Sequence, residues 1–560
     1  MTPPYAPLTP APPLARSLKK GWHVGSGPAI ALKPGIDWSL AVTQDRSWAF
    51  HLVSLDLIDP LLIDHSDTGR PGPLERAIAI ALEWWDWASQ ADQEAINGYD
   101  MAAGMRAWRL SYALLAGRQA GLDPQRLSDL EACLRADLSR LEPEETFAIH
   151  SNHGFFQAAG LLALSASGLA GASDHAALAL DRLRLVLHEH FTDDGVHKEH
   201  SPDYHFFLHR GLAALKARDL LRDPELLRHV DDVVASLAWF VGPDGRLVNF
   251  GDSDNRTLSP TELADLPAPC PGLKVFSQGG YVILRTEAGG YLAQTAGFHS
   301  KVHKQADDLS MIWRAGGRDI LIDAGRLKYG ERTRPGEDLH RSGFRYTDPR
   351  RVYCESVAAH NGLEIEGAAD ARRGPPYGSA IVDVAHVQGV VAILTQVQRA
   401  PFSHRRLVIG DGDNWIVVVD GVPTLRRPLK RQWLHLGPEW SVRADGAGFV
   451  AEAGEDRLRI EPLASARREG PWLGQTADGL RGWWSPKANV FEPAPALAFS
   501  SRRSCMATSL TLGGFGSTFG QVGMNGRVCG TIRLHLGDGR RVTVSVDGVA
   551  LSLVVEGVVT

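Results

Sequence analysis

The sequence predicts two structural domains: a helical domain over residues 36–265 and an antiparallel β-sandwich over residues 275–560, preceded by an N-terminal extension at 1–35. Three observations predict this. Apolar residues recur every three or four positions through the first half, as on one face of an α-helix. Short β-rich segments, with no helical pattern between them, fill the second half. The length of 560 residues also exceeds what one hydrophobic core usually organises.

Composition fits a globular protein and excludes several classes. Hydrophobic residues make up 44% and charged residues 22%, and the net charge of -6 provides no general attraction for polyanions. No basic run indicates nucleic-acid binding. The five cysteines are scattered and odd in number, so free thiols are expected rather than a disulfide framework.

The N-terminal extension is rich in proline and lacks the apolar run of a secretory signal. No stretch of the chain approaches the roughly 18 apolar residues of a membrane span. We therefore expect no membrane association. The expected location is the cytoplasm, or the periplasm or exterior if an export signal has been removed.

The helical pattern is carried by a series of amphipathic segments with short Gly-, Pro- or Asp-bearing connections. These segments are 74–90, 107–121, 127–141, 154–168, 172–191, 204–221 and 226–241. Such connections join antiparallel neighbours, which predicts a bundle or a closed ring of helical hairpins. Ser173 is a candidate N-cap for the fifth segment.

The texture changes across 261–274, the expected domain boundary. The β-rich segments that follow are 280–287, 291–297, 309–316, 318–325, 380–398, 414–422, 432–436, 457–463, 531–548 and 550–559. The Asp-Gly pair in LGDGRRV is typical of a tight hairpin turn. Many short strands at this spacing predict an antiparallel sandwich.

Polar residues interrupt these patterns in four places. Asn152 and His153 precede an apolar helix, where capping is the simplest interpretation. Six histidines gather in 188–209, around Tyr204, which follows a Ser-Pro-Asp turn. His205 and His209 lie four residues apart and could share a helix face as metal ligands, although an incidental surface turn is equally compatible.

The other two places lie in the β-rich half. The stretch 297–325 holds His299, His303, Gln305, Asp307 and Asp308 between two strands, with Asp323 at the end of the next. The stretch 350–367 holds Arg350, Arg351, Tyr353, His360 and Asn361. A charged surface loop and a structural His-Asn pair are the plain alternatives. The chain has no P-loop, no GxSxG and no strand–GxGxxG–helix.

Taken together, these motifs resemble the heparinase II/III-like family of polysaccharide lyases. The ordered motifs are DRSWAFHLVSLDLIDPLL, SNHG, DGVHKEHSPDYH, FGDSD, GGYVILR, HKQADDLS, LIDAG, AAHNGLEIEG and GWWSPKANVFEPAPAL. Each motif is weak alone, but their order and spacing across 36–500 are fairly specific. The resemblance implies an incomplete (α/α) toroid followed by an antiparallel β-sandwich, and a lyase that cleaves a uronate-containing acidic polysaccharide.

The resemblance also implies roles for individual residues. Asn152 and His153 would contact the substrate carboxylate, Tyr204 would be an acid/base, and His303 would be the second acid/base. Gln305, Asp323 and His360 would correspond to the ligands of a single structural divalent metal, calcium or zinc. Tyr353, with Arg350 before it, matches a position where some alginate-directed relatives use a tyrosine.

The chemistry explains why these residue types are needed. β-Elimination removes the proton on C5 of a uronate and expels the oxygen on C4, so negative charge grows on the adjacent carboxylate. Well-placed donors such as an amide and an imidazole stabilise that charge by roughly 3–4 kcal/mol each. A phenol that acts as a base needs nearby positive charge, for which His205, Arg345 and Arg351 are candidates.

Three alternatives stay open at this level. A uronyl C5-epimerase would share the deprotonation but return the proton to the other face. A noncatalytic glycan-binding protein could use the same fold. A glycoside hydrolase would need two facing carboxylates, which the histidine- and tyrosine-centred clusters do not favour.

Overall fold

A computed structural model describes residues 3–25, 27–44, 46–90, 100–268, 270–300, 302–368, 380–515 and 518–557. The chain forms two compact units. Unit 1 comprises Met1–Phe191 and Phe206–Asp232, and unit 2 comprises Thr192–His205 and Val233–Thr560. The predicted limits of the two domains stay a prediction, because the units are defined by contacts rather than by a single point along the chain.

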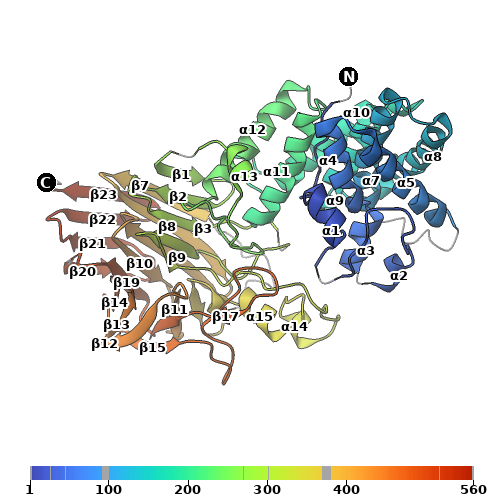
Figure 1. The fold of residues 1–560 in the computed structure, drawn as a ribbon. Helices are drawn as coiled ribbons and strands as arrows, with labels where there is room; N and C mark the ends of the chain where they lie inside the picture. Colours follow the sequence, from blue (N-terminus) through green and yellow to red (C-terminus); the bar gives the residue numbers. More distant parts are fainter. Residues whose placement is uncertain are drawn as a thin grey trace. The chain divides into compact units, whose positions relative to one another are not determined.

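Unit 1 is helical, as the apolar periodicity predicts (Figure 1). Its helices are α1 (Leu14–Lys20), α2 (Leu40–Thr43), α3 (Arg46–Val53), α4 (Asp59–Thr68), α5 (Pro71–Ala88), α7 (Asp100–Gln119), α8 (Pro124–Leu141), α9 (Asn152–Ser165) and α10 (Ala176–His190). Two further helices, α11 (Pro202–Ala217) and α12 (Pro224–Trp239), each run from one unit into the other. The predicted segments therefore correspond to real helices, with ends that differ by a few residues.

Two glycines bring the backbones of α7 and α9 together. A Cβ atom on Gly104 would lie 2.2 Å from the carbonyl oxygen of Phe156, and one on Gly160 would lie 2.2 Å from that of Gly104. Since real Cβ atoms do not approach so closely, any larger residue would push the helices apart. This crossing, together with the buried Phe155 and Phe156, organises the centre of unit 1.

The helix caps differ from those expected. Ser151, not Asn152, is the N-cap of α9, and its hydroxyl accepts a hydrogen bond from the backbone N–H of His153 at 3.3 Å. Ser173 lies inside a short 3₁₀ helix, Ala172–His175, that precedes α10. Asn152 is therefore not needed as a cap, which leaves its side chain to be explained in another way.

Unit 2 consists mainly of antiparallel strands. Its first strands are β1 (Gly272–Phe276), β2 (Tyr281–Arg285), β3 (Tyr291–Thr295), β4 (Met311–Ala315), β5 (Arg318–Leu321), β6 (Leu363–Ile365), β7 (Ala380–Val387), β8 (Val390–Arg399), β9 (Phe402–Gly410), β10 (Trp415–Gly421), β11 (Lys430–His435) and β12 (Ser441–Asp445). The later strands are β13 (Gly448–Ala453), β14 (Asp456–Pro462), β15 (Arg467–Trp472), β16 (Trp483–Trp484), β17 (Glu492–Pro493), β18 (Ala496–Ser501), β19 (Cys505–Leu512), β20 (Thr518–Met524), β21 (Gly530–His535), β22 (Arg541–Asp547) and β23 (Ala550–Glu556).

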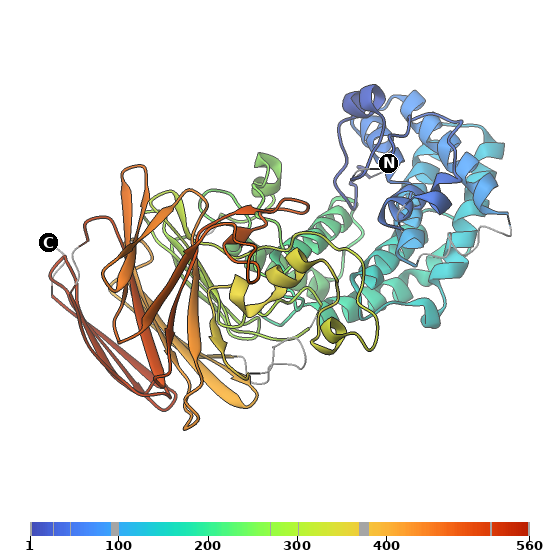
Figure 2. The same cartoon turned by 90° about the horizontal axis from the view of Figure 1, so that it is seen from below.

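An eight-stranded sheet, in the order β12-β13-β14-β19-β10-β9-β8-β7, forms the middle of unit 2 (Figure 2). One of its faces packs on the sheet β1-β2-β3-β4-β5 and the sheet β15-β18-β11-β6. The other face packs on the C-terminal sheet β20-β21-β22-β23. The sandwich therefore has a third layer that the sequence did not predict.

The first five residues of strand β10, Trp415 to Val419, are all apolar because both faces of the strand are covered. Ile416 and Val418 point into one core, whereas Trp415, Val417 and Val419 point into the other. Successive side chains of a strand face opposite sides of the sheet, so a strand covered on both faces loses the usual apolar-polar alternation.

Short helices and loops complete unit 2: α13 (Pro260–Ala264), α14 (Asp338–Arg341) and α15 (Pro349–Glu355). The predicted Asp-Gly hairpin joins β21 to β22, with Gly539 at φ +85°. Within the described ranges, no helix is both long and apolar enough to cross a membrane.

Candidate functional site

Tyr204 lies in the first turn of α11, and a serine fixes that turn. Ser201 Oγ accepts a hydrogen bond from the backbone N–H of Tyr204 at 3.3 Å and donates one to the carbonyl oxygen of Asp252 at 3.0 Å. A serine followed by proline at the first helical position is a common helix start. Ser201 thus joins the beginning of the helix to the loop that carries Asp252.

Gly251 allows the loop that carries His303 to reach the same place. A Cβ atom on Gly251 would lie 2.6 Å from the carbonyl oxygen of His200 and 2.7 Å from that of His303. Gly251 also has φ +56°, a conformation that favours glycine. The backbone N–H of Asp252 then donates to the carbonyl oxygen of His303 at 2.9 Å. Three segments far apart in sequence therefore meet at this glycine.

Four side chains form the centre of the site, which we call the tyrosine–histidine cluster: Tyr204, His303, Tyr329 and Asp252. The rings of Tyr204 and His303 stack with centroids 3.7 Å apart and planes 18° apart. The hydroxyl of Tyr329 lies 3.0 Å from that of Tyr204 and 3.0 Å from His303 Nδ1. It donates to Asp252 Oδ2 at 3.2 Å, and His303 Nδ1 lies 3.1 Å from the same oxygen.

These contacts define a consistent set of proton positions. Because the carboxylate of Asp252 only accepts, His303 Nδ1 carries the proton in that contact and Nε2 is left with its lone pair. Because the single proton of the Tyr329 hydroxyl is donated to Asp252, the Tyr204 hydroxyl must donate to Tyr329. Glu199 Oε2 lies 3.6 Å from His303 Nε2, close enough to stabilise an imidazolium.

Arg351 and Gln305 keep Asp252 charged. Arg351 Nη2 donates to Asp252 Oδ1 at 2.6 Å, and Gln305 Nε2 donates to the same oxygen at 2.9 Å. Burial opposes the charged form, but Arg351, His303 and Gln305 together hold the pKa of Asp252 well below its usual range. The cluster therefore rests on a permanent negative charge.

The two phenols of the cluster stay protonated at neutral pH. Burial is the main cause that raises the pKa of Tyr204 to about 12, and the negative charges of Asp252 and Glu199 add to it. Burial and Asp252 also raise the pKa of Tyr329 well above its usual value. Tyr204 in this state is suited to give a proton rather than to take one.

Of the three predicted sources of positive charge, Arg351 contacts the cluster, whereas the contacts of His205 and Arg345 are with other residues. His205 is buried, and its Nε2 lies 2.9 Å from the carbonyl oxygen of Val233. Arg345 is exposed, and its carbonyl oxygen accepts a hydrogen bond from Thr333. Arg351 is the one of the three that reaches the cluster, where it binds Asp252 and its guanidinium carbon lies 5.4 Å from the ring centre of Tyr329.

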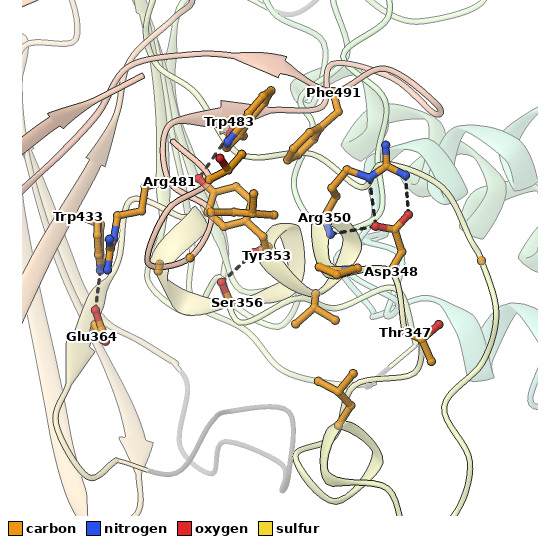
Figure 3. Close-up of a pocket in the computed structure, with 18 of the residues that line it drawn as sticks. Thr347, Asp348, Arg350, Tyr353, Ser356, Glu364, Trp433, Arg481, Trp483 and Phe491 are labelled. Atoms are coloured by element: carbon orange, nitrogen blue, oxygen red, sulfur yellow. Dashed lines mark hydrogen bonds and ion pairs between the residues drawn. The ribbon is translucent and has the colours of Figure 1, made fainter. Parts of the chain in front are cut away.

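Helix α15 carries three of the predicted binding residues, and Arg351 lies on a different face from Arg350 and Tyr353. Arg351 and Glu355, four residues apart, share one face and are joined by a 2.7 Å ion pair. Arg350 and Tyr353 instead line a groove beside the helix (Figure 3). Arg350 pairs there with Asp348 at 2.7 Å.

Asn152 and His153 open α9 in unit 1 and are both partly exposed. The Asn152 side-chain oxygen accepts a hydrogen bond from the Ser151 hydroxyl at 3.3 Å. Their predicted contact with the substrate carboxylate stays a prediction.

The predicted metal ligands come from three neighbouring segments of unit 2. Asp323 and His360 are fully buried and joined by a 2.8 Å contact between Oδ2 and Nδ1. Each of the three predicted ligands has one buried lone-pair atom with no hydrogen-bond partner among the described residues: Gln305 Oε1, Asp323 Oδ1 and His360 Nε2. Buried polar atoms rarely stay unsatisfied, so this donor set fits a bound cation.

No group of three or more His, Cys, Asp or Glu side chains in the described part of the chain could hold a metal. The trio contains only two such residues, because its third member is the amide of Gln305. Metal binding therefore stays a prediction.

Sequence reasoning missed two members of the cluster, Asp252 and Tyr329. Asp252 lies in the FGDSD motif, which stood out only through the family resemblance. Tyr329 follows LIDAG by four residues, and its side chain returns to the site from an irregular loop. The sequence signal that could have indicated Tyr329 is its position in a polar loop, between the loop that carries His303 and the arginine-rich stretch that follows.

The fold and the cluster define a class: a helical toroid followed by a β-sandwich, in which a tyrosine at the start of a helix contacts a histidine from a sandwich loop. Residues 268–511 match the sequence model of the family described as heparinase II/III-like, C-terminal. Over these residues the match confirms the resemblance drawn from the motifs.

Solved structures with the same fold cover both units. The heparan sulfate lyase HepC from Pedobacter heparinus matches with a TM-score of 0.69 and 13% identity, over 97% of this chain and 88% of its own. Another structure, named heparinase III, matches with a TM-score of 0.69 and 14% identity, over 93% and 86%. A sequence comparison with curated proteins found no match. At this identity the structures confirm the predicted fold, a toroid followed by a sandwich.

Proposed function

We propose that the chain is a polysaccharide lyase that cleaves a uronate-containing acidic polysaccharide by β-elimination. The observation that carries the proposal is the tyrosine–histidine cluster, in which a protonated phenol lies against an imidazole oriented by a buried carboxylate. β-Elimination needs one group that takes a proton and another that gives one, and this pair offers both.

His303 is the proposed base. Asp252 accepts the proton on Nδ1, so Nε2 is the nitrogen that can take the C5 proton of the uronate. The electron pair of the C5–H bond becomes the C4–C5 double bond, and the C4–O bond breaks. The imidazolium that forms would be stabilised by Asp252 on one side and by Glu199 on the other.

Tyr204 is the proposed acid. Its pKa of about 12 keeps the hydroxyl protonated, so it can protonate the departing C4 oxygen. Tyr329 lies within hydrogen-bond distance of both Tyr204 and His303. It provides a path by which the Nδ1 proton reaches the phenolate after the product forms; the C5 proton on Nε2 is then lost to water and Nδ1 regains a proton from water.

The carboxylate of the substrate also needs donors as its charge grows. Asn152 and His153 are the proposed donors, an amide and an imidazole at the start of α9. Arg351 acts through Asp252 as a positioning residue, since its guanidinium is buried against that carboxylate. His205, Arg345, Arg350 and Tyr353 remain proposed contacts to substrate units.

A divalent cation, calcium or zinc, would be held by Gln305, Asp323 and His360, and its contribution would be structural. With Oε1 held, the amide of Gln305 would keep its Nε2–H pointed at Asp252 Oδ1, where it donates at 2.9 Å. The same residues would link the loop of His303 to the segments after β5 and α15.

Glycosaminoglycans are the first substrate class to test, because two structures with this fold are named as a heparan sulfate lyase and as heparinase III. Alginate-like chains and bacterial exopolysaccharides are the other candidates with uronate units. The shared requirement is a carboxylate on C5 and a leaving oxygen on C4.

The test is a panel of acidic polysaccharides followed by ultraviolet absorbance of the unsaturated uronate product. We expect absorbance with at least one member of the panel and a fall of roughly a thousandfold in kcat for Tyr204→Phe, since general acid catalysis contributes two to four decades. Tyr346→Phe is the matched control. The rings of Tyr346 and Tyr329 stack with centroids 5.4 Å apart, and the Tyr346 hydroxyl takes no part in the hydrogen bonds of the cluster. The kcat of the Tyr346→Phe variant should therefore stay near that of the parent chain.

Solvent deuterium distinguishes the lyase from a C5-epimerase. Deuterium incorporation at C5 without any absorbance would reject the lyase in favour of the epimerase. Binding of a polysaccharide with neither signal would reject both reactions.

A further inference from the structure

A large groove on unit 2 is not lined by any residue of the tyrosine–histidine cluster. It has a volume of about 1480 Å³ and lies beside α15, between the loop 328–331, strands β6, β11 and β15, and the segment 476–491. Its lining residues Tyr353, Leu480, Trp483 and Phe491 belong to a small apolar cluster whose other members are Ala324, Leu327, Cys354 and Ala359. We call it the α15 groove (Figure 3).

Aromatic rings form one wall of the groove. Trp483 and Phe491 stack with centroids 4.7 Å apart and planes 6° apart, and both are partly exposed. Both come from GWWSPKANVFEPAPAL, a motif that the tyrosine–histidine cluster does not use. A preformed pair of aromatic rings offers a flat apolar surface to the C–H face of a sugar at little cost in side-chain freedom.

The groove is lined by equal numbers of acidic and basic side chains, but not every basic side chain forms an ion pair. Asp348 is paired with Arg350 at 2.7 Å, and Glu469 with Arg431 at 2.9 Å. Glu364 and Glu331 also have arginine partners, at 3.6 and 3.8 Å. In the described part of the chain, Arg481 and Lys328 form no ion pair, so the groove offers two cations to a ligand.

Arg481 is held in place before any ligand arrives. Its backbone pairs with Gln475 in both directions, at 2.9 and 3.1 Å, across a short hairpin. Its guanidinium carbon lies 5.2 Å from the ring centre of Trp472. A stacked guanidinium keeps its forked donors free for a carboxylate or a sulfate.

Two segments connect the groove with the cluster. Lys328, Gly330 and Glu331 line the groove, while Tyr329 between them reaches the hydroxyl of Tyr204. In α15, Arg350 lines the groove and the adjacent Arg351 binds Asp252. Neighbouring residues of one chain are only about 3.8 Å apart at their Cα atoms, so the groove begins next to the site.

We infer that the α15 groove is a second saccharide-binding site, which takes uronate-bearing units of the same polysaccharide beyond the unit that reacts at Tyr204 and His303. Trp483 and Phe491 contact the sugar rings, and Arg481 and Lys328 pair with the acidic substituents. The inference rests on the proposed function for the identity of the chain that is held.

The test measures binding and catalysis separately. Calorimetry would titrate Tyr204→Phe, and the double variant Tyr204→Phe with Arg481→Ala, with full-length heparan sulfate and with full-length alginate. Loss of a charge-assisted forked contact should weaken the affinity for the bound polymer about tenfold. In the otherwise native chain, Arg481→Ala should raise KM for the polymer about tenfold and have little effect on kcat.

Arg443→Ala is the matched control. Arg443 is an exposed arginine on β12, 56% accessible, that pairs with Glu452 at 3.6 Å, and its removal should change neither value. Trp483→Ala is the second variant, and its unfolding midpoint is recorded because Trp483 also packs in the small apolar cluster. The inference would be overturned if Arg481→Ala and Arg443→Ala changed affinity and KM equally. It would also be overturned if neither Arg481→Ala nor a folded Trp483→Ala changed them.

Failure of the proposed function is distinguishable from failure of the groove. If no polysaccharide yields unsaturated product but the affinity still depends on Arg481, the groove holds and the elimination is wrong. If product forms and its KM does not depend on Arg481 or Trp483, the elimination holds and the groove assignment is wrong.

Discussion

Two regions of unit 2 contain the same four kinds of side chain in a different setting. In the tyrosine–histidine cluster, Asp252 is contacted by His303, Arg351 and Gln305. In the sandwich core, Asp420 is contacted by His404 at 2.7 Å, by Arg406 at 2.8 Å through each oxygen, and by Gln432 at 2.7 Å.

The difference lies in access and in what surrounds the histidine. His404 and Asp420 are fully buried between strands, and Asp420 lies opposite Arg406 in the register of β9 and β10. Burial first of all lowers the pKa of His404, which keeps it neutral. His303 instead is 17% exposed and stacks on a tyrosine. Side-chain composition alone therefore does not define a reactive site.

Replacing His303 and His404 in turn tests most directly whether the two regions have different roles. His303→Ala should lower kcat by about a thousandfold with little change in the free energy of unfolding, since a general base contributes two to four decades. His404→Ala should lower the free energy of unfolding by about 2–3 kcal/mol, because Asp420 loses a buried partner. Denaturant unfolding and steady-state kinetics would measure both, and an equal loss of rate in the two variants would contradict the distinction.

Tyr329→Phe tests whether the second phenol has its own role. It removes the hydroxyl that links Tyr204, His303 and Asp252 but keeps the ring near Arg351. Loss of the three contacts of this hydroxyl should lower kcat about tenfold, with KM nearly unchanged. A rate equal to that of Tyr346→Phe would exclude Tyr329 from the proton path.

The smallest expected effect concerns the titration of Tyr204. Its folded pKa of about 12 exceeds the ordinary value of 10.0, so the folded state binds the proton more tightly. The stability that this adds is complete below about pH 10 and is lost as the pH rises toward about 12. The difference between the phenolate absorbance of the native chain and that of Tyr204→Phe should therefore appear near pH 12, and its appearance near pH 9 would assign Tyr204 as the base.

Apolar content predicted the helices of unit 1, and residues 107–121 overlap most of α7, although α7 and α9 are buried on nearly all sides rather than on one face. The strands were predicted less completely. The apolar stretch 380–398 forms two strands, β7 and β8, that turn at Gln388 and Gly389, both with positive φ. The segments of β21–β23 were predicted as strands, but their packing as a third layer was not, because it depends on contacts with strands far away along the chain.

The candidate site divides in the same way. Tyr204 and His303 were predicted from motifs, and they lie in contact. Asp252 and Tyr329 come from loops whose path depends on Gly251 and on backbone contacts, neither of which periodicity describes. Adjacent residues can also have different surroundings, because successive side chains of a helix are rotated by about 100° around its axis. His205 therefore contacts the carbonyl oxygen of Val233, while Tyr204 contacts Tyr329.

The covered middle sheet sets where this protein can change. In β10, every position from Trp415 to Val419 is enclosed, so a polar replacement at any of them meets the same penalty. Residues on the open side of the α15 groove, such as Lys328, Arg431 and Arg481, are at least partly exposed and are free of that constraint. Under the proposed function, preference for a new glycan can therefore diverge at the rim of the groove over evolutionary time while the centre of the domain stays as it is.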